Sequence, residues 1–259
     1  MPDLLYEKKQ NYAIFTYNRP ERLNALGGTL MQDLREAIQD FVSDDSMRAA
    51  IVTGAGRAFS AGADLKEMSE RNTTGGGRQV QLGHRGLDAS FPWVDVPKPV
   101  IAAVNGLAIG GGMETAMSCD IRICSTEAYF GLFEVKRGIM AGYGIHHLMR
   151  LIPASHAYYT VFTADRILPD QALQWGFVTE VLQPDRLIPR AEEIAAMIAE
   201  NAPLAEAGSK AIMRSWRTYG VDDSLQLAGW VGKVVLDSED AREGPLAFTE
   251  KRAPIWKNR

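Results

Sequence analysis

The fold is decided by one stretch of the chain, which reads Val104-Asn-Gly-Leu-Ala-Ile-Gly-Gly-Gly-Met-Glu-Thr-Ala-Met-Ser-Cys-Asp120. Its first residue is the last of an apolar run, Pro99 to Val104, whose length and β-branched content predict a strand buried on both faces. Good helix formers follow the glycines Gly110 to Gly112, so a strand, a glycine turn and a helix start are expected there. Such a turn gathers unpaired backbone N–H groups at the positive end of a helix, which favours an anionic oxygen. Glu114 falls in the first helical turn beside this point.

A phosphate site and plain helix packing are two other interpretations of this turn. No lysine follows Gly112, so the Walker pattern is absent. The loop Gly54-Ala-Gly-Arg-Ala-Phe59 lacks the third glycine of a dinucleotide fingerprint. Close packing of the helix on a strand stays open as an alternative, because glycine lets two backbones approach.

An earlier segment has the same pattern. The run 48–53 has the composition of a strand, 54–63 is a loop rich in glycine and alanine, and 64–68 begins a helix. Two such turns could each direct one backbone N–H at the same oxygen, which is the arrangement of an oxyanion hole.

Composition and charge exclude several classes of protein. The 259 residues carry 28 basic and 32 acidic side chains, so no basic surplus indicates nucleic acid. Two cysteines, Cys119 and Cys124, are too few for a disulfide framework and have no zinc-ligand spacing, which favours buried thiols in a reducing compartment. No signal peptide and no apolar run of membrane-spanning length is found, so we expect a cytoplasmic protein with no membrane partner.

The hydrophobic pattern predicts alternating strands and helices in the first two thirds of the chain and helices afterwards, an α/β core with a C-terminal helical subdomain. Strands are expected at 4–7, 12–17, 48–53, 99–104, 120–124, 128–130 and 177–182. Helices are expected at 29–42, 155–163, 169–175, 187–200, 203–219 and 221–238, the first capped by Thr29. Residues 69–86 are interpreted as a mobile loop that runs into a helix, and they either shape access to a site or form a plain surface connection.

Several segments in this order resemble the crotonase, or enoyl-CoA hydratase/isomerase, superfamily from end to end. They are Ala58-Phe-Ser-Ala-Gly-Ala-Asp-Leu-Lys-Glu67, Pro97-Lys-Pro-Val-Ile-Ala-Ala-Val-Asn-Gly106, Gly110-Gly-Gly-Met-Glu114, Ser118-Cys-Asp120, Trp175-Gly-Phe-Val178 and the tail 238–252. The resemblance implies a crotonase-like ββα spiral core over 1–190. It also implies a helical subdomain over 191–259 that takes part in oligomerisation and in the coenzyme A pocket.

The resemblance also implies roles for individual residues. It makes the N–H groups of Ala63 and Gly111 the oxyanion hole for the thioester oxygen, and Glu114 and Glu134 the catalytic pair. Gly142 matches a glycine beside the catalytic water. Adding water to an α,β-unsaturated thioester needs a base for the water and a proton for the α-carbon, and two carboxyl groups meet both needs.

Substrate-binding positions come from the same resemblance. Those matched to coenzyme A are Leu23, Ala61, Asp64, Leu65, Lys66, Phe248 and Lys251, and the last two belong to a tail that reaches a neighbouring subunit in trimeric members. Those matched to the acyl pocket are Met68, Phe133 and Tyr143. Phe133 stands where fatty-acid hydratases often have proline, and Tyr143 is bulkier than the usual alanine. The two argue for a specialised acyl group instead of a straight fatty chain.

The sequence therefore predicts reversible hydration of a 2-enoyl-CoA to a 3-hydroxyacyl-CoA, with coenzyme A as part of the substrate and no further cofactor or metal. Double-bond isomerisation or thioester hydrolysis on the same scaffold are the alternatives, because the superfamily hosts several reactions. A non-catalytic coenzyme A- or RNA-binding relative is the alternative from another class. The resemblance also implies a homotrimer or homohexamer.

Overall fold

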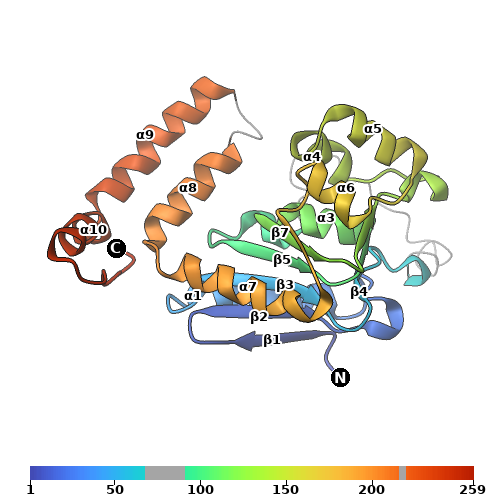
Figure 1. Cartoon of the computed structure of the whole chain (residues 1–259), viewed down its shortest axis with the longest axis horizontal. Helices are drawn as coiled ribbons and strands as arrows, with labels where there is room; N and C mark the ends of the chain where they lie inside the picture. Colours follow the sequence, from blue (N-terminus) through green and yellow to red (C-terminus); the bar gives the residue numbers. More distant parts are fainter. Residues whose placement is uncertain (68–90, 216–219) are drawn as a thin grey trace.

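The computed structural model describes residues 1–67, 91–215 and 220–259, and two sheets form the centre of this part of the chain (Figure 1). The larger sheet has the strand order β1-β2-β3-β5-β7-β9 and the smaller one β4-β6-β8. The larger sheet contains β1 (Leu4–Lys8), β2 (Tyr12–Tyr17), β3 (Ala49–Gly54), β5 (Val100–Val104), β7 (Ile121–Ser125) and β9 (Glu180–Leu182). The smaller contains β4 (Ala58–Ser60), β6 (Leu107–Ile109) and β8 (Tyr129–Gly131). Only the hairpin β1–β2 is antiparallel among these pairings.

The chain winds between the two sheets in a repeated step. After β3 it enters β4, after β5 it enters β6, and after β7 it enters β8. Each turn of this spiral therefore adds one strand to each sheet. The helices of the core are α1 (Leu30–Ser43), α3 (Gly111–Ser118), α4 (Gly144–Leu151), α5 (Ala154–Thr163), α6 (Pro169–Gln174) and α7 (Pro184–Ala199), with short 3-10 helices η1 (Pro20–Arg22), η3 (Pro92–Asp95) and η4 (Glu134–Arg137).

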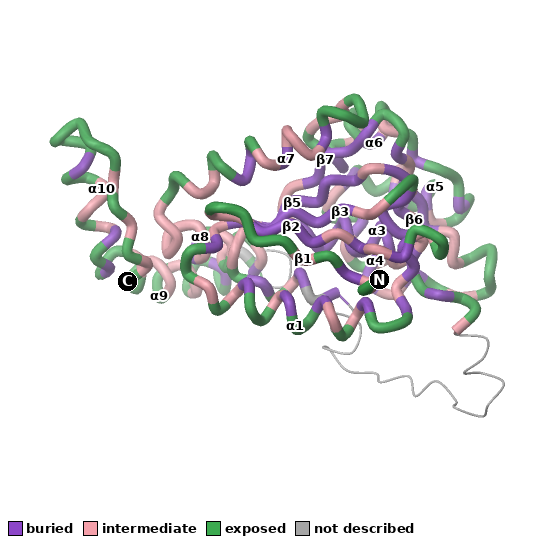
Figure 2. Tube along the Cα trace, turned by 90° about the horizontal axis from the view of Figure 1, so that it is seen from below, coloured by how far each residue is buried: buried purple, intermediate pink, exposed green. Residues whose placement is uncertain are grey.

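The larger sheet is covered on both faces, which explains the unbroken apolar runs of its central strands. Every residue of β5 is buried, and purple tube follows the central strands in Figure 2. On one face α7 packs its buried side chains, Leu187, Ala191, Ile194 and Ala195, against the strands. On the other face lie α1 and the smaller sheet.

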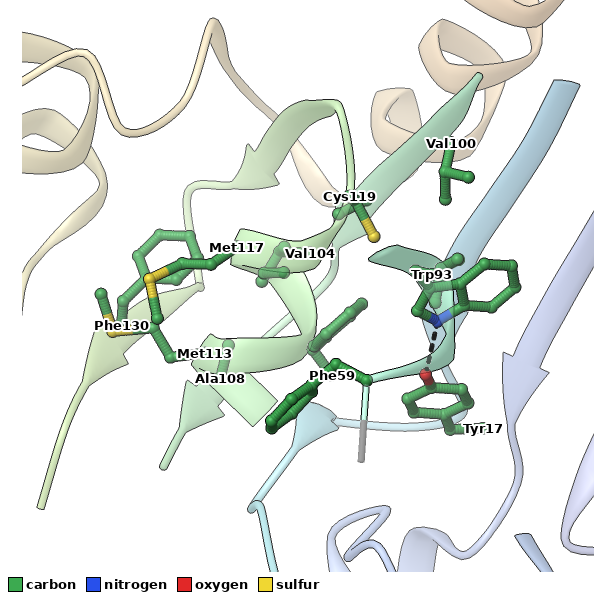
Figure 3. Packing of buried hydrophobic residues seen from close by; sticks show 14 of the residues in the cluster. Tyr17, Phe59, Trp93, Val100, Val104, Ala108, Met113, Met117, Cys119 and Phe130 are labelled. Atoms are coloured by element: carbon green, nitrogen blue, oxygen red, sulfur yellow. Dashed lines mark hydrogen bonds between the residues drawn. The ribbon is translucent and has the colours of Figure 1, made fainter. Parts of the chain in front are cut away.

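The core between the sheets is built from large side chains. Trp93 and Tyr17 are both fully buried, and the Trp93 Nε1–H donates to Tyr17 Oη over 3.0 Å, so the polar atoms of this pair are satisfied (Figure 3). Met113 and Met117 of α3 lie beside Phe130 of β8 in the same cluster (Figure 3). This packing fixes α3, and with it the first helical turn that follows the glycines.

Most predicted elements are confirmed to within a few residues, with four corrections. Segment 54–63 was expected to be a loop but contains β4, and the strand that enters the triple glycine is β6, not β5. Strands β4 and β6 have three residues each, which is too short for a recognisable sequence pattern. They are stabilised by pairing in the smaller sheet. Strand β9 is shorter than the predicted run 177–182. Thr29 precedes α1, but its hydroxyl donates to Asp33 Oδ2 instead of capping a backbone N–H.

The last helices, α8 (Pro203–Ser215), α9 (Val221–Asp237) and α10 (Glu239–Glu250), extend away from the sheets (Figure 1). The predicted division at residue 190 falls inside α7, which packs on the sheet, and the division itself stays a prediction. The predicted access loop 69–86 and Met68 lie outside the described residues. No helix in the described part of the chain is long and apolar enough to cross a membrane.

Candidate active site

A cavity of about 410 Å³ opens where β4 and β6 end. Its walls come from elements far apart in the sequence: the segment before α1, α1 itself, the two turns, η4 and the start of α4. The lining residues are Leu26, Met31, Arg35, Ala61, Ala63, Leu65, Phe91, Ile109, Gly110, Gly111, Glu114, Phe133, Glu134, Arg137, Ile139, Met140, Gly142 and Tyr143.

The two predicted turns meet at this cavity. A Cβ placed on Gly62 would lie 2.7 Å from Gly111 N, and one on Gly111 would lie 3.5 Å from Ala63 N. Gly111 is the first residue of α3, so its N–H has no acceptor within the helix. The backbone N–H groups of Ala63 and Gly111 are therefore brought together at the positive end of α3.

The triple glycine serves close packing as well. A Cβ on Gly112 would lie 2.1 Å from Ser60 O, so α3 can approach β4 only with glycine here. Gly110 has φ +54°, which a residue with a Cβ adopts at a cost, and a Cβ there would lie 3.3 Å from Glu134 Oε1. Packing and the gathering of N–H groups are thus two consequences of the same three residues.

Glu114 is the more deeply buried of the two predicted catalytic carboxyl groups. It is 6% exposed, and its Oε1 accepts a 2.7 Å hydrogen bond from Gly144 N–H, at the start of α4. Burial raises the pKa of Glu114 to about 7; the Gly144 hydrogen bond opposes this rise and the charge of Glu134 adds to it. The Glu114 side chain is therefore held in place by a hydrogen bond, and its pKa lies near neutral pH.

Glu134 begins η4 and is only half-buried. Its Oε2 is screened from solvent and has no hydrogen-bond partner among the described residues. Burial raises the pKa of this carboxyl above its ordinary value. Glu134 and Glu114 line the same cavity, and the charge of Glu134 contributes to the raised pKa of Glu114.

Three of the residues predicted to contact coenzyme A lie at or beside the cavity rim. Ala61 and Leu65 line the cavity, and Lys66 is exposed next to Leu65. Leu23 is half-buried with a left-handed φ of +52° and accepts a backbone hydrogen bond from Ala61 N–H. These residues therefore form one strip of backbone beside the entrance.

Asp64 has a different environment from its neighbours. It is 7% exposed and its Oδ2 accepts from Arg19 Nη2 over 3.2 Å, while Oδ1 accepts from the N–H groups of Lys66 and Glu67. Burial alone would raise the pKa of Asp64, but these hydrogen bonds and the Arg19 charge hold it below its usual value. The Asp64 carboxylate is therefore engaged by the turn itself, and its predicted contact with coenzyme A stays a prediction.

The other two predicted coenzyme A residues are far from this cavity within one chain. Phe248 and Lys251 belong to the end of α10, on the opposite side of the molecule from β4 and α3 (Figure 1). Phe248 is 84% exposed. Within one chain these two residues therefore do not reach a ligand in this cavity, and their predicted contact with coenzyme A stays a prediction.

The predicted acyl-pocket residues Phe133 and Tyr143 both line the cavity, as does Gly142. Tyr143 is 2% exposed, and its ring packs 5.1 Å from that of Phe91 and 3.8 Å from that of His147. Bulky aromatic rings therefore form part of the cavity wall.

Several residues that matter to the site gave no signal in the sequence. Asn24 is fully buried and donates from Nδ2 to the carbonyl oxygens of Ala55 and Ala58, which fixes the first turn. Arg35 and Arg137 line the cavity from α1 and η4. Side chains such as these are found only when tertiary structure joins distant segments.

Comparison with known proteins agrees with this architecture. The profile of the enoyl-CoA hydratase/isomerase family matches residues 7–259. The chain belongs to this family, which places it in the crotonase superfamily.

Individual relatives cover nearly the whole chain. A short-chain-enoyl-CoA hydratase of Clostridium acetobutylicum is 40% identical over 253 residues, 96% of this chain and 95% of the relative. A carnitinyl-CoA dehydratase of Salmonella arizonae is 40% identical over 248 residues, 93% of each. Among solved structures, an enoyl-CoA hydratase from Mycobacterium tuberculosis superposes with a TM-score of 0.90 at 33% identity, covering 100% of both chains.

Proposed function

We propose that the protein catalyses reversible hydration of a 2-enoyl-CoA to a 3-hydroxyacyl-CoA. The observation that carries this proposal is that two carboxyl groups, Glu114 and Glu134, line one cavity beside the paired N–H groups of Ala63 and Gly111. The names of the relatives, a short-chain-enoyl-CoA hydratase and a carnitinyl-CoA dehydratase, support the same type of reaction.

In the proposed mechanism the thioester oxygen accepts hydrogen bonds from Ala63 N–H and Gly111 N–H. As the oxygen of water bonds to C3, electrons move to the thioester oxygen, and the enolate-like charge is stabilised by these donors and the α3 dipole. One carboxylate accepts the proton that the water loses, and a carboxyl group supplies the proton that C2 gains. One O–H bond is broken and one C–O and one C–H bond are formed, so the atoms of one water molecule are added without a redox cofactor.

The pair of carboxyl groups favours hydration over isomerisation. Isomerisation moves one proton from one carbon of the substrate to another, for which a single base is enough. Hydration needs two proton transfers, because the water loses a proton and C2 gains one. A pKa of about 7 at Glu114 would let that group exist in either protonation state near neutral pH. Isomerisation and thioester hydrolysis remain the alternative outcomes of the experiment below.

Coenzyme A is proposed to lie along the strip formed by Leu23, Ala61, Leu65 and Lys66, which runs from the cavity to the surface. Lys66 is suited to a phosphate by charge and exposure. The acyl group would then point toward Phe133 and Tyr143.

Assembly into trimers or hexamers is part of the proposal. The helices α9 and α10 expose large apolar side chains, which are unfavourable in water unless covered. They include Leu225, Trp230, Val234, Leu236, Leu246 and Phe248. We expect light scattering at micromolar concentration to give at least a trimer and Trp230→Glu to weaken it; a wild-type monomer would overturn this part of the proposal.

Mass spectrometry of the products tests the proposed reaction. The purified protein is incubated with 2-enoyl-CoA thioesters that have short, branched, cyclic or aromatic acyl groups, beside a Glu134→Gln control. We expect the intact thioester to gain the mass of one water in the wild type only. Release of free coenzyme A would favour a hydrolase, and an unchanged mass with a shifted double bond would favour an isomerase.

A further inference from the structure

Two arginines line the same cavity as the glutamates. The Arg35 and Arg137 side chains reach it from α1 and η4, which are separated by about a hundred residues of sequence. Both residues are exposed, and neither forms an ion pair with any residue in the described ranges. An anion that enters the cavity would therefore meet two exposed arginines in its wall.

The position of Arg137 ties it to the reacting end of the substrate. Glu134 and Arg137 are the first and last residues of η4. In a 3-10 helix the side chains at i and i+3 eclipse, with a rise of about 6 Å over three residues. A group bound by Arg137 would therefore lie a few carbon atoms from the atoms that Glu134 contacts.

Arg35 lies beside apolar residues that also line the cavity. Met31 and Arg35 are one helical turn apart on α1 and both line the cavity, while Leu30 and Leu34 point into the core. Ile139 and Met140, directly after η4, add further apolar surface to the same cavity. The walls thus offer apolar contact for a short carbon chain and positive charge within reach of it.

An anionic acyl group also fits the charge balance of the site. Two glutamates in one cavity repel a third carboxylate, and a guanidinium group compensates by pairing with it in a fork geometry. The phosphates of coenzyme A are the other source of negative charge. They are expected beside Leu65 and Lys66, on the strip that leads out of the cavity.

On this basis, and resting on the proposed hydration, we propose that the preferred substrate is a 2-enoyl-CoA whose short acyl chain ends in a carboxylate. Arg137 binds this carboxylate and Arg35 assists. Such a substrate, the coenzyme A monothioester of a dicarboxylic acid, differs from a neutral fatty enoyl-CoA by the charge at the end of its acyl chain.

A matched pair of substrates tests the proposal. Hydration of glutaconyl-CoA is compared with that of its methyl ester, which has almost the same shape and no acyl charge. We expect kcat/KM to be about ten-fold or more higher for the acid, the ratio that one charged hydrogen bond supports. Arg137→Gln should abolish most of this preference and Arg35→Gln part of it, while Arg150→Gln, an exposed arginine of α4 outside the cavity, should leave it unchanged.

Two further measurements separate the possible failures. If the arginines bind coenzyme A phosphates, Arg137→Gln lowers kcat/KM equally for acid and ester, and the loss disappears with N-acetylcysteamine thioesters; this overturns the proposal. Equal kcat/KM for acid and ester in the wild type overturns it as well.

Calorimetric binding of the saturated thioesters glutaryl-CoA and butyryl-CoA needs no turnover. Tighter binding of glutaryl-CoA, lost in Arg137→Gln, would support carboxylate recognition even if hydration itself is absent.

Discussion

The first turn of α3 and the short helix η4 each present one glutamate to the same cavity, in contrasting ways. Glu114 is nearly fully buried and accepts a hydrogen bond from Gly144 N–H. Glu134 is half-buried, and its Oε2 has no protein partner within the described ranges. One carboxyl group is fixed by the scaffold, and the other keeps an acceptor site for a ligand.

This contrast shows how one fold can give two identical side chains different properties. Burial dominates the raised pKa of both groups, but the backbone donors that oppose the rise differ: Glu114 accepts from Gly144 N–H at the start of α4, whereas Glu134 has only its own backbone N–H. Carboxyl groups placed so differently can divide acid and base roles between them. The predictions below test that division.

Replacement of either carboxyl group is expected to have the largest effect. Glu134→Gln and Glu114→Gln keep the shape of the side chain but cannot exchange a proton, so each should lower kcat by about a thousand-fold or more. Hydration of a 2-enoyl-CoA measured by loss of the enoyl absorbance checks this. A Glu127→Gln variant, at an exposed position outside the cavity, serves as the control and should keep full activity.

The triple glycine gives the next largest effects, and they should differ between positions. Gly112→Ala places a methyl group against Ser60 O, so we expect loss of several kcal/mol of stability or failure to fold. Gly110→Ala meets only the movable Glu134 side chain but strains a positive φ, which costs roughly 1–3 kcal/mol and displaces the carboxyl.

Thermal unfolding and kcat/KM together separate the two glycine variants. Gly110→Ala should lose about 10- to 100-fold in kcat/KM while still folding. Equal thermal stability of both variants would contradict the packing role that we assign to Gly112.

The smallest effect concerns the pH dependence of stability. Because the pKa of Glu114 rises from 4.5 when unfolded to about 7 when folded, its contribution is most favourable below pH 4.5 and is lost as the pH rises through 7. Glu114→Gln does not titrate. Relative to the wild type, the variant should therefore gain about 3 kcal/mol of stability between pH 4.5 and pH 8. Urea unfolding at several pH values checks this, and a constant difference would contradict the raised pKa.

Much of this arrangement follows from sequence, and the rest depends on tertiary contacts. The buried run of β5, the hairpin β1–β2 and the glycine-to-helix transition at Gly110 carry strong local patterns. Strands β4 and β6 are too short for such a pattern, and only their pairing with each other and with β8 defines them. These strands deliver the two turns to the cavity, so the geometry of the candidate site depends on contacts that no local window contains.

Some residues that line the cavity could also be predicted from the sequence, and others could not. Glu114 and Glu134 could be predicted because they stand at matched positions of a familiar pattern. Arg35 and Arg137 could not, because an arginine on an exposed helix face looks the same in sequence whether it faces solvent or a cavity. The buried Asn24 was missed for a similar reason, since a polar residue in a turn-like segment gives no sign of burial.

A double-mutant cycle on the two glutamates tests the central claim most directly. The kcat/KM for hydration is measured for the wild type, Glu114→Gln, Glu134→Gln and the double variant, with folding verified by circular dichroism. If the two carboxyl groups act as a unit on one water, the double variant should be about as slow as the slower single variant, because groups that act together are strongly non-additive. If the two losses multiply instead, the groups act independently, and the shared role of Glu114 and Glu134 would have to be abandoned.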